Sequence, residues 1–349
     1  MTPPPRRPAY SLTHSAIPSL ALSVAVALAA CGGAEVPAAS PQAGTGAPAP
    51  TSAPTAAAAT GTSAPGPAPV SQVPPAPDTA EGGRLFDKFY GASKPFASFK
   101  PDSGKTKTSP DGKGGVDGTG ILKLVNGDWL QNDTRHDYRF KNLFGWDLKG
   151  QAGIYGPSQM KKPYAVKRNL LAGKETIDEL TALLTTGSED IPAYGPVLDG
   201  SALRNIAAFI VAVRDGALPH PDSIFTLAPP DRGHYALRPG GDAARGQKMF
   251  GERCSGCHGA DGTKLLFDDG AFSLGSHARQ KAYEDWAKIL NGQPGSPMGR
   301  QVQGATAKEM AQEILDLFAA LCDRKAFPRG KATSEDVKDG DGRCAAYLK

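Results

Sequence analysis

Residues 254–258 read Cys-Ser-Gly-Cys-His, and this pentapeptide constrains the chain more than any other feature of its sequence. Two thiols about one helical turn apart can reach both vinyl groups of one haem, and the adjacent imidazole then lies over the iron as an axial ligand. The motif therefore predicts covalent attachment of one haem c through Cys254 and Cys257, with His258 as the proximal iron ligand.

Two other interpretations of the same residues are a zinc half-site and a thioredoxin-like dithiol. Zinc would need a second pair of Cys or His at ligand spacing nearby, and no such pair follows in the sequence. A redox dithiol does not account for the histidine, and no β-α-β pattern surrounds the motif. Haem is therefore the favoured cofactor.

The N-terminus carries an export signature. Arg6 and Arg7 precede an apolar run, Ile17 to Ala30, which is short for a membrane span and leads into Cys31-Gly32. This segment is similar to a bacterial lipoprotein signal, so we expect residues 1–30 to be removed and Cys31 to carry lipid. A plain secretory peptide with a coincidental cysteine is the alternative. Because haem c is attached outside the bacterial cytoplasm, both features predict an exported protein, on the periplasmic side of the inner or outer membrane or at the cell surface.

Composition divides the rest of the chain. Residues 31–80 are mainly Ala, Pro, Gly, Ser and Thr, carry only two charges (Glu35 and Asp78) and contain no aromatic residue, so we expect a disordered tether. The remainder is long enough for two domains of ordinary size. Residues 218–241 contain five prolines between two helical patterns. The pattern indicates a domain at 81–217, a linker at 218–241 and a second domain at 242–321, followed by a tail at 322–349.

The segment 242–321 has the pattern of an all-α domain. A helix follows the N-cap candidate Asp242, apolar positions recur at helical spacing in 281–290, and residues 308–321 carry a clear apolar stripe. No stretch alternates with period two for long enough to indicate a sheet. We therefore expect an all-α haem pocket.

This segment resembles a class I c-type cytochrome domain over its whole length. The resemblance implies an N-terminal helix, the haem motif, a middle helix, a loop with the sixth iron ligand and a C-terminal helix. In such domains a Met in a Pro- and Gly-rich loop is that ligand, and Met298 occupies this place in the loop 291–299. Where the family usually has Pro after the Met, this chain has Gly299.

Chemistry also favours Met298 as the sixth ligand. Met249 and Met310 fall on apolar stripes of predicted helices, where Met is commonly core filler. A thioether opposite a histidine raises the haem potential and closes the iron to substrate. The alternative distal ligand is His277, which we expect in a loop as an exposed histidine.

The segment 81–217 resembles a second cytochrome c-like domain without its haem motif. Helices are predicted at 176–184 and 201–213, and residues 140–147 align with 254–261 so that the shared Gly and Asp fall in register. Phe140, Leu143 and Phe144 then occupy the positions of the two Cys and the His, and Ile191 that of the Met. The alternative is an unrelated helical domain with a chance match. His136, the only histidine of this segment, is expected at the surface.

Cysteine counting predicts one disulfide. Of the five cysteines, Cys31 is assigned to lipid and two to haem, which leaves Cys322 and Cys344 in an oxidising compartment. Joining them closes a loop worth about 3 kcal/mol in the chain-entropy model. The loop is polar and helix-poor, so the disulfide is expected to hold the tail.

The expected fold is thus two all-α cytochrome c-like domains in tandem, and the expected function is a membrane-tethered mono-haem electron carrier rather than an enzyme. The alternatives are a cytochrome subunit of an oxidoreductase complex, and a haem-based sensor or enzyme if Met298 is not a ligand. Partners would be redox proteins and, through the lipid, a membrane. The net charge is only +4, and no basic block with interleaved aromatics suggests nucleic acid.

Overall fold

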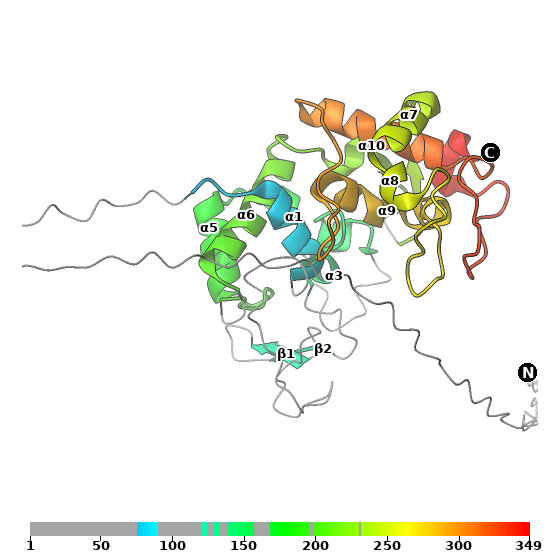
Figure 1. Cartoon of the computed structure of the whole chain (residues 1–349). Coiled ribbons are helices and arrows are strands. Elements are labelled where there is room, and N and C mark those ends of the chain that lie inside the picture. Colours follow the sequence, from blue (N-terminus) through cyan, green and yellow to red (C-terminus); the bar gives the residue numbers. More distant parts are fainter. Residues whose placement is uncertain are drawn as a thin grey trace, which may run out of the picture. The chain divides into compact units, whose positions relative to one another are not determined.

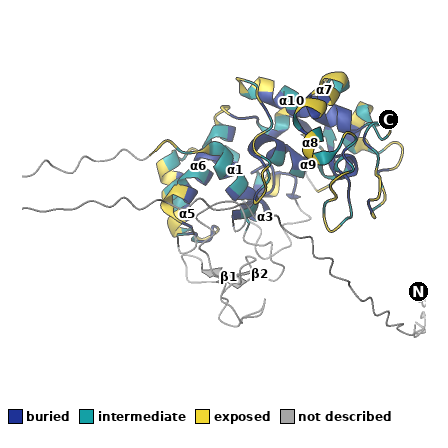
Figure 2. Ribbon diagram, in the orientation of Figure 1, coloured by how far each residue is buried: buried dark blue, intermediate teal, exposed yellow. Residues whose placement is uncertain are grey.

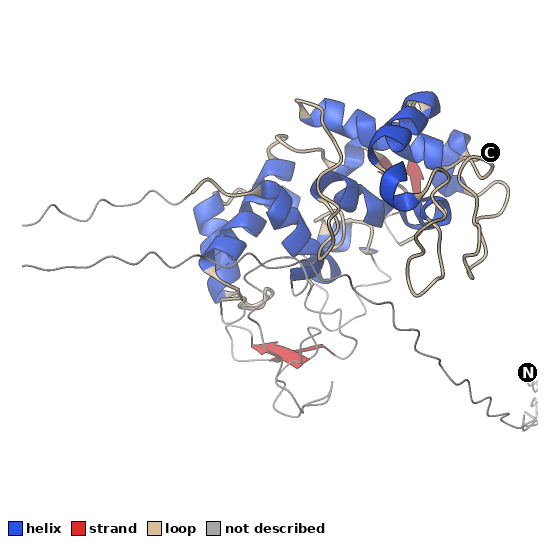
Figure 3. Ribbon diagram, viewed as in Figure 1, coloured by secondary structure: helices blue, strands red, loops and turns tan. Residues whose placement is uncertain are grey.

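The computed structural model describes residues 75–89, 120–123, 129–132, 139–156, 168–195, 198–229 and 232–349, the two four-residue segments by their backbone only (Figure 1). The predicted signal peptide, Cys31, most of the predicted tether and His136 lie outside these residues. Of the described residues 50% are helical and 4% are in strands, which confirms the prediction of a mostly helical fold for this part of the chain (Figure 3).

Four helices make up the second helical half, residues 242–321: α7 (Ala243–Arg253), α8 (Ser255–His258), α9 (Leu274–Asn291) and α10 (Ala307–Leu321). The three longer ones begin at side-chain caps, from Asp242, Ser273 and Thr306, which accept hydrogen bonds from the first free backbone N–H groups. Helix α9 begins before its predicted start at residue 281, and the backbone bends there, because Lys281 has φ −139° and ψ 32°.

Helices α7 and α10 pack against each other at a glycine. A Cβ on Gly246 would lie 1.9 Å from the carbonyl oxygen of Asp316 in α10, so this close approach requires glycine. The Asp316 carboxylate accepts a hydrogen bond from the Asp242 backbone N–H at 2.7 Å and one from Arg245 Nε at 2.8 Å. The first turn of α7 is therefore fixed to the middle of α10, directly ahead of the Cys-x-x-Cys-His motif.

We expect Gly246→Ala to destabilise the protein by about 1–3 kcal/mol or more, because the added methyl forces α7 and α10 apart. Gly251→Ala is the matched control in the same helix. Its Cβ would have no atom within 4 Å, so it should be neutral or stabilise by up to ~1 kcal/mol through helix propensity. Urea unfolding followed by circular dichroism measures both, and equal stabilities of the two variants would contradict the close crossing.

The first helical half, residues 75–217, contains α1 (Thr79–Lys88), α3 (Phe140–Phe144), α5 (Ile177–Thr186) and α6 (Gly200–Arg214). Short 3-10 turns lie at η2 (Gly150–Ala152) and η3 (Leu170–Ala172), and β1 (Gly120–Lys123) pairs with β2 (Trp129–Asn132) antiparallel. Helices α5 and α6 match the predicted helices 176–184 and 201–213. Because α1 begins directly after its cap Asp78, regular structure starts inside the last residues of the predicted tether.

An aromatic cluster forms the core of this half. The rings of Phe140 and Tyr194 stack with their centroids 4.2 Å apart, and Phe86 contacts both Phe140 and Phe209 at 5.9 and 5.8 Å. Helix α3 is buried on most sides, as its colouring in Figure 2 shows. Burial of rings of this size contributes to the apolar packing that holds α1, α3 and α6 together.

The N-terminal helices of the two halves are capped and packed in the same way. Asp78 caps α1 through the N–H groups two and three residues on, as Asp242 caps α7. Each Asp also donates its own backbone N–H to a side chain of the last helix of its half. Asp78 donates to Asn205 Oδ1 in α6 at 2.9 Å, and Asp242 donates to Asp316 Oδ1 in α10 at 2.7 Å. Four residues after each Asp comes a glycine that packs against the same partner. A Cβ on Gly82 would lie 1.9 Å from the carbonyl oxygen of Asn205, and a Cβ on Gly246 would lie 1.9 Å from that of Asp316.

The short helices and the following loops also correspond. Helix α3 ends at Gly145 (φ 81°, ψ 158°) and α8 at Gly259 (φ 84°, ψ 162°). Helices α5 and α9 end at Gly187 and Gly292, both with positive φ. The next residue then donates its N–H across the loop, Ser188 to Ile191 O at 2.9 Å and Gln293 to Met298 O at 3.0 Å. The two halves thus repeat one arrangement of helices and turns.

The predicted linker 218–241 contains regular structure that packs on α9 and α10. Strands β3 (Phe225–Leu227) and β4 (Tyr235–Leu237) pair antiparallel. The Phe225 ring lies 5.9 Å from that of Phe318, and Tyr235 Oη accepts a hydrogen bond from the Ala282 N–H at 3.0 Å. Strands of three residues are too short for an alternating pattern to be recognised in the sequence.

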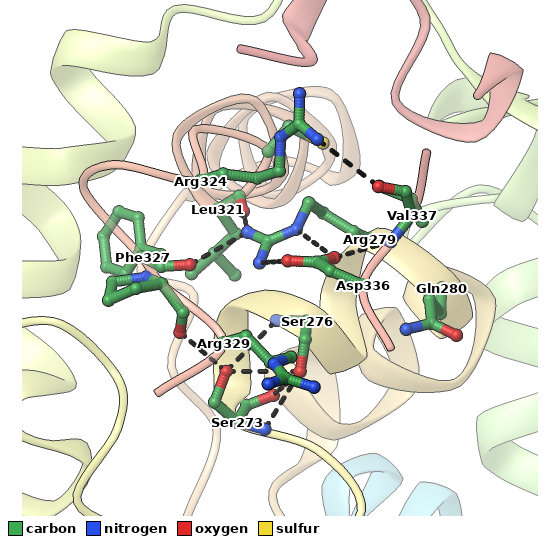
Figure 4. Close-up of polar contacts among 12 residues, drawn as sticks. Ser273, Ser276, Arg279, Gln280, Leu321, Arg324, Phe327, Arg329, Asp336 and Val337 are labelled. Atoms are coloured by element: carbon green, nitrogen blue, oxygen red, sulfur yellow. Dashed lines mark hydrogen bonds and ion pairs between the residues drawn. The ribbon is translucent and has the colours of Figure 1, made fainter. Parts of the chain in front are cut away.

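The tail 322–349 is also packed on the second half. Cys322 and Cys344 form a disulfide, with their Cα atoms 5.9 Å apart. Arg279, fully buried in α9, pairs with Asp336 of the tail and donates to the carbonyl oxygens of Leu321 and Phe327 at 2.8 and 3.0 Å (Figure 4). The disulfide therefore closes the tail into a loop, and the ion pair of Asp336 with Arg279 joins that loop to α9.

Candidate functional site

The second half encloses a mostly apolar cavity of about 280 Å³. Its walls include the two cysteines and His258 of the motif, which come from one turn of the chain, and Met298, which comes from the loop after α9. Helices α7, α9 and α10 supply apolar side chains around them. The residues that line the cavity are Phe250, Cys254, Cys257, His258, Leu265, Phe267, Leu274, His277, Asp285, Lys288, Ile289, Gln293, Ser296, Pro297, Met298, Gln301, Leu317 and Leu321.

The pentapeptide motif forms a single turn at the end of α7. Cys254 is both the C-cap of α7 and the N-cap of α8, and its carbonyl accepts the N–H groups of Cys257 at 3.2 Å and His258 at 3.0 Å. This turn directs residues 254, 257 and 258 toward the same cavity. Gly259 then reverses the chain with a φ of 84° that side chains rarely adopt.

Both thiols of the motif are free. Cys254 is buried and Cys257 is exposed. Burial raises the pKa of the Cys254 thiol to about 11, so it is protonated at neutral pH. It is thus a poor nucleophile on its own, and the exposed Cys257 sulfur is the more accessible of the two.

His258 presents a neutral imidazole to the cavity. Burial lowers the pKa of the ring, which favours the form with a free lone pair. The Nδ1 atom is buried and, among the described residues, has no hydrogen-bond partner. The Phe267 ring lies 5.9 Å from the imidazole and forms part of the same wall.

Met298 lies in the loop that follows α9 (residues 292–300), which we call the ligand loop after the iron ligand that the sequence predicts there. Gly292 opens the loop with a φ of 96°, and a Cβ there would lie 2.4 Å from Met298 O. Ser296 Oγ accepts the Met298 N–H at 3.1 Å. Met249 and Met310, by contrast, are buried within α7 and α10, as their helical stripes predicted.

The environment expected for His277 is wrong. The residue does not lie exposed in a loop: it lies in the first part of α9, with 3% of its surface exposed. Its Nδ1 is 2.9 Å from Asp285 Oδ2, and the ring lines the same cavity as Met298. The sequence interpretation failed because α9 was expected to begin at residue 281. A helix from 274 would have placed 277, 285 and 288 on one stripe.

Lys288 is a cavity residue that sequence reasoning missed. Burial alone would lower the pKa of its ammonium, but the carboxylates of Asp285, Asp87 and Glu284 raise it, so the side chain is charged. Together with His277 and Asp285 it adds a group of titratable side chains from α9 to a cavity that is mostly apolar. The helical spacing of these three residues in the sequence could have shown that they share one face of α9.

The corresponding positions of the first half hold side chains of the core. Phe140, Leu143, Phe144 and Ile191 are all fully buried. The Phe140 ring stacks between Tyr194 and Phe86. Apolar side chains therefore occupy this half at the places where the second half carries its thiols, imidazole and thioether.

Among the described residues, no group of three or more His, Cys, Asp or Glu comes together in a way that could hold a metal ion. In the same part of the chain, no helix is both long and apolar enough to cross a membrane. The chain matches no protein-family model, no curated protein and no solved structure.

Proposed function

We propose that the second half binds one haem c and that the protein is a one-electron carrier. The observation that carries this proposal is the meeting of Cys254, Cys257, His258 and Met298 in one cavity, although the methionine is some forty residues away in the chain. Two thiols, one imidazole and one thioether are the donors that a covalently held, His/Met-ligated haem requires. The His258 imidazole, whose buried Nδ1 has no hydrogen-bond partner among the described residues, and the apolar walls of the cavity also fit a haem.

Each side chain has a definite role in this proposal. Cys254 and Cys257 would hold the macrocycle through thioether bonds, while His258 and Met298 would be the axial ligands. Bound haem supplies a reversible one-electron iron couple. The apolar residues of α7, α9 and α10 exclude water, which disfavours the more highly charged ferric form and so raises the potential.

One side of the cavity reaches the protein surface, which suits electron exchange with other proteins. Leu265 lines the cavity and is 43% exposed, and Leu266 beside it is 39% exposed. Cys257 is exposed on the same cavity. Because protein side chains would fill both axial positions of the iron, small molecules would have no open iron site. Electrons would instead pass to a redox partner through the exposed side of the cavity near Leu265 and Cys257.

We further propose that the first half is a cytochrome c-like domain that carries no haem. The matched caps, glycine contacts and loop hydrogen bonds of the two halves support this proposal, as do the apolar residues at the four ligand-equivalent positions. With the N-terminal sequence, the complete proposal is an exported lipoprotein, lipidated at Cys31 and held to a bacterial membrane, with one haem and two helical domains.

The test is the haem content of the exported full-length protein. A pyridine haemochrome assay should give about one haem per chain, because only Cys254 and Cys257 combine two thiols with an adjacent imidazole. Cys257→Ala should lose normal covalent attachment, measured as haem retained on a denaturing gel. The double variant Cys322→Ala, Cys344→Ala removes two cysteines elsewhere and should keep its haem. A content near two, or near zero, would overturn the proposal.

A further inference from the structure

Helix α1 of the first half contacts the beginning of the ligand loop. Arg84 Nη1 donates a hydrogen bond to the carbonyl oxygen of Asn291, the last residue of α9, at 2.7 Å. The guanidinium is fixed by Glu81 one turn earlier in α1, through hydrogen bonding at 2.8 Å and an ion pair at 2.7 Å. Asn291 immediately precedes Gly292, where the chain leaves α9 and turns toward Met298.

The backbone of α1 also approaches Asn291 closely. A Cβ on Gly83 would lie 2.1 Å from Cγ of Asn291, so any larger residue there would displace the Asn291 side chain. The Asn291 side chain is 1% exposed, and its Nδ2 donates to the Ala287 carbonyl at 3.0 Å. Asn291 is therefore held on one side by α9 and on the other by α1.

The far end of the ligand loop has a contact with α1 as well. Arg300 Nε donates to the Leu290 carbonyl at 2.8 Å, and Arg300 Nη2 lies 3.2 Å from Thr79 Oγ1 in the first turn of α1. The next residue, Gln301, donates its N–H to the Ile289 carbonyl at 2.9 Å. Both ends of the ligand loop are thus tied to the end of α9, and α1 contributes to each tie.

We propose that α1 of the first half positions Met298, with Arg84 as its principal positioning residue. This inference rests on the proposed function, in which Met298 is an axial ligand. The loop contains Gly292, Gly295 and Gly299, so its open forms have high conformational entropy. Fixing both ends lowers that entropy and raises the population in which Met298 faces the cavity. The haem-free half then serves to keep the sixth iron position closed.

Imidazole binding to the ferric full-length protein tests this role, because imidazole can reach the iron only when Met298 has left it. In Arg84→Ala we expect imidazole to bind about tenfold more tightly than in the unmodified protein, an effect of ~1.4 kcal/mol on the opening equilibrium. Arg84→Lys should recover part of the difference, since it keeps the charge but not the forked geometry.

Arg214→Ala is the matched control. Arg214 also donates through Nη1 to a backbone carbonyl, that of Glu175 at 2.9 Å, and pairs with an acidic neighbour, Asp215, but it does so within the first half. Its removal should leave imidazole affinity unchanged. Hydrogen exchange of residues 292–301 provides a second measurement, and it should be faster in Arg84→Ala than in Arg214→Ala. Thr79→Val, which removes only the hydroxyl near Arg300, should shift both measurements in the same direction by less.

Equal imidazole affinities and equal exchange rates in Arg84→Ala and Arg214→Ala would overturn the positioning role while leaving haem binding intact. An unmodified protein without haem would instead overturn the proposed function. The exchange comparison would still decide whether α1 holds the ligand loop.

Discussion

Met298→Ala is expected to open the sixth iron position. The ferric protein should lose the weak long-wavelength absorption band that marks Met-to-iron ligation, and it should bind cyanide, as the ferrous protein should bind carbon monoxide. The midpoint potential should fall by on the order of 0.1 V or more, since axial ligands set haem potentials over a range of about 0.8 V. The physical reason is that Met298 is the thioether on the cavity wall, in a loop held at both ends.

Met310→Ala is the control for this experiment. Met310 is buried in α10, so its truncation should cost about 2–5 kcal/mol of stability through the cavity it leaves, while the Met-to-iron band persists. If the band survives in Met298→Ala, Met298 is not the ligand. A protein that lacks the band before any substitution, and in which His277→Ala rather than Met298→Ala opens the iron to carbon monoxide, would transfer the role to His277, which lines the same cavity.

The helices that sequence reasoning found have strong local signals. Helix α10 combines a capping box at Thr306 with a continuous apolar stripe from Met310 to Leu321, and α7 begins at Asp242. Such features act within a few residues, so they can be recognised in the sequence alone. The pentapeptide motif is local in the same sense, and its two cysteines and its histidine all line the cavity.

The first part of α9 was missed because its buried face is polar. Ser276, His277 and Arg279 are all buried, and their polar groups are paired with Ser273, Asp285 and Asp336 in turn. A search for apolar periodicity passes over such residues, since they are normally exposed. The bend at Lys281 further divides the helix into two patterns.

The sequence contains one further sign that the two halves are related. Asp78 and Gly82 have the same spacing as Asp242 and Gly246, and the structure shows equivalent caps and equivalent glycine contacts. The signal was missed because Asp78 falls in a stretch assigned to the tether on composition. Contacts between α1 and the ligand loop could not be foreseen at all, because they join residues more than two hundred positions apart.

Asp336→Ala is expected to destabilise the protein by about 3–5 kcal/mol, the cost of leaving one buried charge without its partner. Arg279 is fully buried, and Asp336 binds it through both carboxylate oxygens, Oδ1 accepting from Nε at 2.8 Å and Oδ2 pairing with Nη2 (Figure 4). Without Asp336 the guanidinium keeps only its carbonyl partners, Leu321 and Phe327.

The control is Asp339→Ala, three residues further along the same tail. Asp339 pairs with Arg324, but its side chain is 88% exposed, so this substitution should cost less than ~1 kcal/mol. Urea unfolding of the oxidised protein isolates the ionic contribution, because the disulfide Cys322–Cys344 is present in both variants. Because Phe327 packs on Phe250 with ring centroids 4.7 Å apart, and Phe250 lines the cavity, we also expect Asp336→Ala to loosen the cavity wall. Equal stabilities of the two variants would show that Arg279 does not depend on the tail for its charge compensation.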